Sequence, residues 1–442
     1  MTTLETMATG QCAARRAVRL ASAPEAPPLV LPAAHFAAAF GFLVLAGLAL
    51  VRAAPAVAAG AFLAGPVTAA VHLVTLGWIT LSIMGVLYQF LPVALGIGIA
   101  SRPLAYATFA LFVPGLLLFV AGAAAEAPRP REAGLALVAV AVVAFLANLG
   151  RTLARVESRG ITFWGLAVGA ANLAFVLVLG LALGASLSNG WLASSRLDVV
   201  AAHVHLALAG WVMPVVVGVS RRLMPMFLLA HDADIRPSAA ALAGLGAGAP
   251  LLAAGLGLRA PWAAAVGAGL VVAALLAFAF QVGLYFRARR RPRVDPGMRM
   301  AATAVGGLLA AVLLGPAVLV LGSREPGLAT AYGTIVLFGG FAPLVAGHYY
   351  RIVPFLVWYH RYSPLVGRAP VPKVSDLVTP GPPSLALGLL VVGVLLVAAA
   401  PLGLGTGAAR TGGVLFAAST LVVAGHMAAV AWPRTAARGV GR

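Results

Sequence analysis

Three histidines stand inside long apolar segments of the sequence, where side chains that can bind a metal are uncommon. His72 lies in one segment, and His203 and His205 lie in another as the triplet His-Val-His. An imidazole there can ligate a metal, bond to another helix or exchange a proton. Ionisable groups within a bilayer are costly, so they mark function more often than histidines in a soluble core do. For His203, capping or an ion pair with the nearby Asp198 has at least as strong a claim as ligation.

The residues that follow His72 and His205 form one repeated pattern. Each histidine precedes a Gly-Trp pair, a second glycine and a proline at identical intervals. A third segment keeps both glycines and the proline, but Thr334 replaces the histidine and Gly340 the tryptophan. Paired glycines let a neighbouring helix or a flat ligand approach closely, whereas the tryptophans are expected to be packing residues. The matched residues are Gly77, Trp78, Gly85 and Pro92; Gly210, Trp211, Gly218 and Pro225; and Gly339, Gly347 and Pro354.

The elements that must position these residues are membrane-spanning helices. The chain has 442 residues, 62% of them hydrophobic and 9% charged, which leaves too little polar surface for a soluble protein. Apolar runs of about 20 residues follow one another, unlike the short alternating segments of a β-barrel. We therefore predict an all-α polytopic membrane protein with about twelve transmembrane helices. The expected spans are 34–51, 67–97, 104–124, 133–149, 162–186, 199–220, 238–257, 261–286, 301–321, 329–358, 383–402 and 412–432.

The repeat divides these spans into equal groups. The pattern starts at residues 72, 205 and 334, so it returns about every 130 residues, or every four spans. This predicts three pseudo-symmetric four-helix repeats, at about 34–150, 160–287 and 300–433, within one membrane domain of residues 32–433. Residues 1–31 and 434–442 are expected to be a cytoplasmic arm and a cytoplasmic tail.

Membrane topology explains the formal charge of +19. The basic residues sit in short loops and not on one amphipathic face, so membrane lipids are the expected partners and nucleic acid is not. If the N-terminus is cytoplasmic, most Lys and Arg residues fall on the cytoplasmic side, because basic residues near span ends resist translocation. This predicts a multi-pass protein of the bacterial inner membrane with both termini in the cytoplasm. The single cysteine, Cys12, excludes a disulfide framework within the chain.

Twelve helices in three repeats, with the second, sixth and tenth at the centre, resemble subunit I of the heme-copper oxidase superfamily. The resemblance covers most of the chain and implies that His72 ligates a heme near the outer face. The pair His203 and His205 is similar to the family's copper-ligating histidine in helix six, or to the H-x-H of C-family oxygen reductases and nitric oxide reductases. Residues two apart on a helix point about 200° apart, so this pair suits two neighbouring sites. One specific hypothesis is a heme b whose iron lies between His72 and His205.

The chain departs from this family where oxygen would be reduced. The seventh span contains no histidine, so copper is not expected. The tenth span has Tyr332 and Thr334 in place of the heme-ligating histidines, and every acidic residue falls in a tail, a joint or a span end. Carboxylate proton relays are therefore not expected, and complete oxygen-reductase chemistry is doubtful.

Two classes of function remain open. The first is a heme-binding protein of electron transfer or of O2 or NO handling; if an enzyme, it is an oxidoreductase of the cytochrome c oxidase or nitric oxide reductase type. Its partners would be other respiratory subunits or a separate electron donor, because the sequence has no CxxCH motif. The alternative is a heme-free transporter or a respiratory-complex assembly factor on the same scaffold.

The remaining histidines, arginines and aromatic residues of the spans are expected to have structural roles or to contact the membrane surface. His35, His348 and His426 are expected to be packing residues. Arginines and histidines at the inner ends of spans six and ten are expected to contact lipid headgroups, or else an anion or a heme propionate: these are Arg222, His231, Arg351, His360 and Arg361. The aromatic residues around them predict an interfacial belt: Tyr349, Tyr350, Trp358, Tyr359 and Tyr362.

Overall fold

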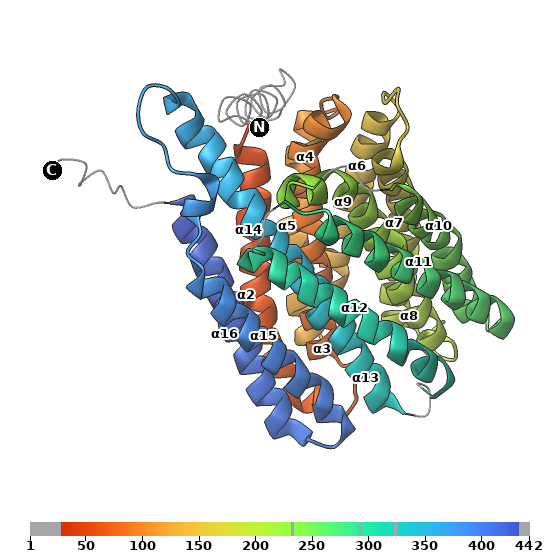
Figure 1. Ribbon diagram of the computed structural model, residues 1–442. Coiled ribbons are helices and arrows are strands. Elements are labelled where there is room, and N and C mark those ends of the chain that lie inside the picture. Colours follow the sequence, from red (N-terminus) through yellow and green to blue (C-terminus); the bar gives the residue numbers. More distant parts are fainter. Residues whose placement is uncertain (1–27, 231–233, 291–293, 322–324, 433–442) are drawn as a thin grey trace.

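A computed structural model describes residues 28–230, 234–290, 294–321 and 325–432. Every regular element in these ranges is helical, and twelve spans are long and apolar enough to cross a bilayer (Figure 1). The predicted all-α class and the number of spans are confirmed. The first helix begins at Val30, slightly before the predicted domain boundary. The expected arm and tail fall almost entirely outside the described residues.

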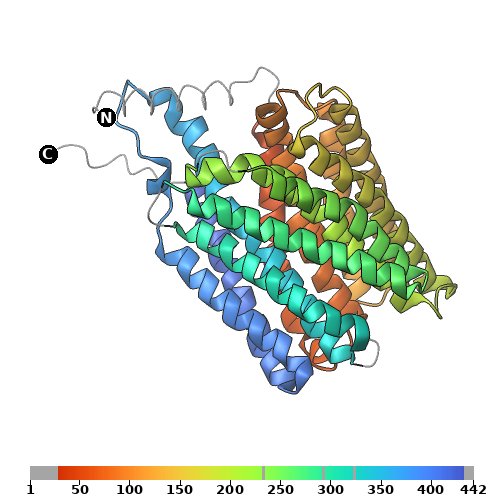
Figure 2. The same cartoon turned by 45° about the vertical axis from the view of Figure 1, so that its right-hand side comes forward.

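The spans run side by side in one bundle (Figure 2). Nine of the described spans are single helices: α2 (Val30–Ala58), α5 (Arg102–Ala124), α6 (Pro128–Leu153), α7 (Ile161–Asn189), α10 (Arg236–Gly257), α11 (Pro261–Arg287), α12 (Pro296–Leu321), α15 (Gly381–Ala399) and α16 (Gly405–Ala431). Prolines stand in the first turn of several of them, where the missing N–H has no partner to lose. Pro128 and Pro261 are examples. Gly190 ends α7 in the left-handed conformation, which glycine adopts without strain.

The second, sixth and tenth spans each consist of two α-helices joined by a π-helical segment. They are the three most buried of the twelve spans, as expected of helices that line the centre. Their elements are α3 (Gly65–His72), η1 (Leu73–Thr80) and α4 (Leu81–Leu95); α8 (Arg196–His205), η2 (Leu206–Val212) and α9 (Met213–Leu228); and α13 (Pro326–Thr334), η3 (Ile335–Phe341) and α14 (Ala342–Val357). Short helical turns follow α14 at Trp358–Tyr362, Ser363–Leu365 and Val374–Leu377, and α15 at Ala400–Leu402.

Each π-helical segment begins at the residue directly after the head of the repeat, namely His72, His205 or Thr334. In the second and third copies a proline, Pro214 or Pro343, comes just after the segment. A proline lacks the N–H that an α-helix needs, and a π-turn is one way to accommodate it. The first copy has the same segment without a proline at that position, so proline is not the only cause.

Packing between helices follows the predicted grouping into units of four. The first helix of each unit packs on the central span of that unit: α2 on α3 and α4, α7 on α9, and α12 on α14. The third and fourth helices pair as hairpins: α5 with α6, α10 with α11, and α15 with α16. α2 also packs on α16, so contacts join the first and third units as well. A threefold arrangement of three complete units stays a prediction.

The second repeat glycine makes the contact between the first helix and the central span close. A Cβ atom on Gly85 would lie 2.7 Å from Cβ of His35, and one on Gly347 would lie 2.6 Å from the carbonyl oxygen of Gly297. A Cβ atom on Gly218 would lie 3.2 Å from Cα of Gly165. The space that these glycines leave is therefore filled by a neighbouring helix, which was one of the two expected uses.

Candidate functional site

His72 and His205 lie at the same place in their spans, at the end of an α-helix and directly before the π-helical segment. In each, Nδ1 is 2.8 Å from the carbonyl oxygen four residues earlier, that of Thr68 or Ala201. A carbonyl oxygen only accepts, so Nδ1 donates and Nε2 remains as the nitrogen for a ligand. This bond fixes the tautomer and the ring orientation, as it does in histidines that ligate metals.

The three candidate histidines point to different neighbours. The ring of His72 meets Phe119 of α5 edge-on, with 5.0 Å between centroids. The ring of His205 stacks on Tyr332 of α13, with 6.3 Å between centroids and 25° between planes. His203 packs against α7, where a Cβ atom on Gly180 would lie 3.2 Å from its Cε1 atom. His203 and His205 thus face different spans, as residues two apart on a helix must.

His203 lies within electrostatic range of His72, and its ring also meets the backbone of Val176 on α7. Its buried Nδ1 atom makes no hydrogen bond of ordinary geometry. Among the described contacts, none joins His72 to His205. Among the residues that the structure describes, no group of three His, Cys, Asp or Glu side chains is close enough together to bind a metal ion. The expected absence of copper stays a prediction.

A cavity of about 90 Å³ lies between spans two, six and ten. Counted from residues 72, 205 and 334, its lining positions are the same in all three spans: 7, 10, 11, 14 and 15 residues on, with position 18 added in spans six and ten. The three central helices therefore turn the same face toward one another. The lining residues are Ile79, Ser82, Ile83, Val86 and Leu87; Val212, Val215, Val216, Val219, Ser220 and Leu223; and Phe341, Leu344, Val345, His348, Tyr349 and Ile352.

The hydroxyl groups of this cavity already have hydrogen-bond partners. The hydroxyl of Tyr349 donates to Oγ of Ser82 over 2.9 Å, and Ser82 donates to the carbonyl oxygen of Trp78. The hydroxyl of Ser220 donates to the carbonyl oxygen of Val217 over 3.1 Å. Tyr349 is 1% exposed, so the predicted place of this tyrosine in an interfacial belt is wrong. It is a core residue between two central helices.

His348 is the remaining polar residue of the described cavity lining. Its Nδ1 atom donates to the carbonyl oxygen of Leu344 over 2.7 Å, which leaves Nε2 for a ligand. The equivalent positions in the other central spans are Val86 and Val219. Sequence reasoning treated His348 as a packing residue. A comparison of the three copies would have pointed to it, because His348 is the ionisable side chain at a position that is valine in the other two.

The two repeat tryptophans join the central helices at the cavity. Nε1 of Trp78 donates to the carbonyl oxygen of Ala342 over 3.2 Å, and Nε1 of Trp211 donates to Oγ1 of Thr80 over 3.4 Å. In both bonds the acceptor stands eight residues after the head of its own repeat. The tryptophans are packing residues, as predicted, and they also bond one central helix to the next. The third copy has Gly340 at this position and lacks the donor.

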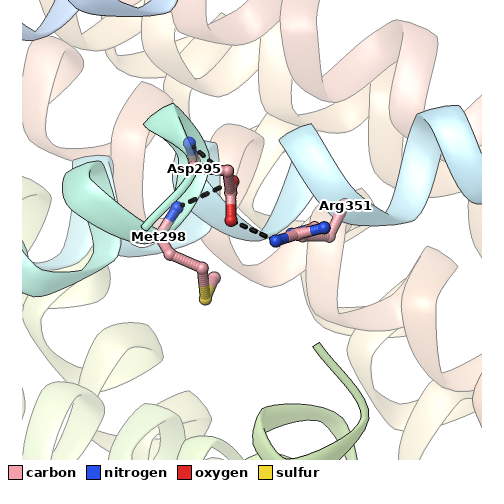
Figure 3. Close-up of polar contacts among 4 residues, drawn as sticks. Asp295, Met298 and Arg351 are labelled. Atoms are coloured by element: carbon pink, nitrogen blue, oxygen red, sulfur yellow. Dashed lines mark hydrogen bonds and ion pairs between the residues drawn. The ribbon is translucent and has the colours of Figure 1, made fainter. Parts of the chain in front are cut away.

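Arg351 forms an ion pair with Asp295 and does not face an open anion site. Figure 3 shows its guanidinium bonded to the carboxylate of Asp295, which also accepts the backbone N–H groups of Gly297 and Met298 over 3.0 and 3.2 Å at the start of α12. The positive charge is thereby compensated. The repeat-equivalent Arg222 is exposed, as is His360. His231 lies outside the described residues.

Comparison with known proteins assigns no family. Neither a scan against protein-family models nor a search of curated proteins finds a match to the chain.

Proposed function

We propose that the chain is a heme-binding membrane protein related to subunit I of the heme-copper oxidases, acting in electron transfer or in O2 or NO handling. The observation that supports this most is the geometry of His72 and His205. Each ring is fixed by a bond from Nδ1 to the backbone, directly before a π-helical segment. Such segments are frequent at functional sites. Nε2 of each ring is then an oriented ligand atom within the membrane.

In this proposal His72 supplies one axial ligand and a histidine of span six the other. The shared repeat pattern favours His205 as the second ligand. His203 is the alternative, because it lies within electrostatic range of His72. Bound heme, with both axial positions taken by histidines, would supply one-electron redox chemistry. The protein's own part is to orient the imidazoles, with Phe119 and Tyr332 packed against the rings. Copper has no supporting donor set in the described chain.

The test is a reduced-minus-oxidised visible spectrum with pyridine hemochrome quantitation, on protein purified in mild detergent from heme-sufficient cells. We expect one or two hemes per chain and the loss of a Soret band in His72→Ala. His360→Ala, which removes an exposed histidine, should keep the band. Comparison of His203→Ala with His205→Ala identifies the second ligand. A colourless wild-type protein, or an undiminished band in His72→Ala, overturns the proposal.

We further propose that the membrane is the bacterial inner membrane, with both termini in the cytoplasm. The described start of α2 and end of α16 lie toward the same end of the bundle (Figures 1 and 2). The excess of basic residues in the loops of that side supports a cytoplasmic position for it. Fluorescence from a green fluorescent protein fused to the C-terminus, which folds in the cytoplasm but not after export, checks the orientation. A dark fusion of normal abundance contradicts it.

The central cavity favours a second candidate function, a heme-free transporter. The cavity runs along spans two, six and ten instead of lying beside the histidines that precede the π-helical segments. A stable but colourless protein that moves a small solute across vesicle membranes would support this candidate. Copurification of oxidase subunits with a colourless protein would instead favour an assembly factor.

A further inference from the structure

We propose that the cavity between spans two, six and ten binds a small neutral molecule with one hydrogen-bond donor and an otherwise apolar body, held by Nε2 of His348. The proposal does not rest on heme binding. It assigns a class of ligand to the cavity. If the protein is a heme-free transporter, this ligand would be its solute.

Among the described lining residues, His348 carries the one nitrogen acceptor, and no group of the protein bonds to it. Ser82, Ser220 and Tyr349 each donate to an atom of the protein. Nδ1 of His348 donates to Leu344, so in the neutral ring Nε2 carries a lone pair and no proton. An acceptor buried in an apolar cavity without a partner is unfavourable, and a ligand that donates one hydrogen bond removes this penalty.

The walls exclude charged and strongly polar ligands. Apart from the four residues already described, every lining residue is aliphatic or Phe341, and no lining residue carries a permanent charge. An inert gas would fit the walls but would leave Nε2 unbonded. A single donor on an apolar body matches both features.

The size and shape of the cavity suit a small, elongated body. The cavity offers about 90 Å³, several times the roughly 10–15 Å³ that a single water molecule needs. The lining positions run from 7 to 18 residues after the repeat heads, which corresponds to about 17 Å along a helix. The space is therefore narrow and elongated. A short aliphatic alcohol satisfies these conditions.

The test follows the Nε2 atom of His348 directly. Protein labelled with ¹⁵N-histidine is placed in lipid nanodiscs, and the His348 resonance is assigned by its disappearance in His348→Leu. Ethanol and dimethyl ether are the matched probes, because they are isomers of nearly the same size and only ethanol donates a hydrogen bond. Ethanol is expected to move the Nε2 resonance to lower frequency in a saturable manner, and dimethyl ether is not.

Two variants that fill the cavity provide the control. Val219→Phe and Val86→Phe place a phenyl ring in the layer of His348 from spans six and two, and each is expected to abolish the saturable change. If one variant does not fold, the other variant and the comparison of ethanol with dimethyl ether still test the proposal. An absent ethanol response, an equal response to the two isomers, or a response that survives both substitutions overturns the proposal. A failure of heme binding would appear in the Soret band and leave this result unchanged.

Discussion

Replacement of Gly347 by alanine tests whether close helix contact fixes the central spans. The new Cβ atom would lie 2.6 Å from the carbonyl oxygen of Gly297 and 2.8 Å from the backbone N of Ala301. Both obstacles are backbone atoms of α12, so no side chain can rotate away. The helices must separate until the shorter distance grows from 2.6 Å to the ordinary 3.4 Å. Overpacking of this kind costs about 1–3 kcal/mol.

Gly306→Ala is the matched control on the same helix as Gly297. A Cβ atom there would meet nothing within 4 Å, and the residue is exposed on the bundle surface. Both substitutions gain about 1 kcal/mol of helix propensity, so their difference isolates the clash. We expect Gly347→Ala to be less stable than Gly306→Ala by about 1–3 kcal/mol in detergent unfolding titrations. Equal unfolding free energies for the two variants would refute the close contact between α12 and α14.

Two further substitutions probe bonds between the spans, with the same unfolding titration as the readout. Trp78→Phe removes the bond to the Ala342 carbonyl and should cost about 0.5–1.5 kcal/mol, and no loss would mean that the bond is not formed in the membrane. Asp295→Asn leaves the guanidinium of Arg351, whose side chain is 15% exposed, without its counter-charge and should cost about 1.5–3 kcal/mol. Asp198→Asn breaks a pair with a 64% exposed arginine and should cost about 0–1 kcal/mol; the reverse order would contradict the different burial of the two pairs.

The number of spans was predictable because each helix buries backbone polar groups in lipid and must be apolar over its whole length. The ends of the helices were less predictable. The first span was expected over 34–51, but α2 continues through Arg52 to Ala58 and contains Pro55. A long basic side chain can reach the interface from within a helix, so a charge does not mark the end of one. Apolar periodicity alone does not reveal this.

The repeat carried more information about the site than the individual residues did. Its glycines were expected to allow close approach, and the structure shows which helix approaches each of them. Its spacing also relates the residues that line the cavity, because they stand at the same positions in all three copies. The spacing does not predict which face of each helix turns toward the cavity. A π-helical segment rotates the helix that follows it, and in the first copy no residue type predicts that segment.

The two candidate ligand sites lie at different depths of the central helices, and the copies differ in which depth carries a histidine. Copies one and two have His72 and His205 at the head, and valine fourteen residues later. Copy three has Thr334 at the head and His348 fourteen residues later, a distance of about 21 Å along a helix. A heme held at the heads and a small donor held at His348 would therefore not compete for the same space. Val219→Phe, which fills the cavity, should therefore leave the Soret band unchanged. A changed band would mean that the heme site and the His348 site are coupled through span six.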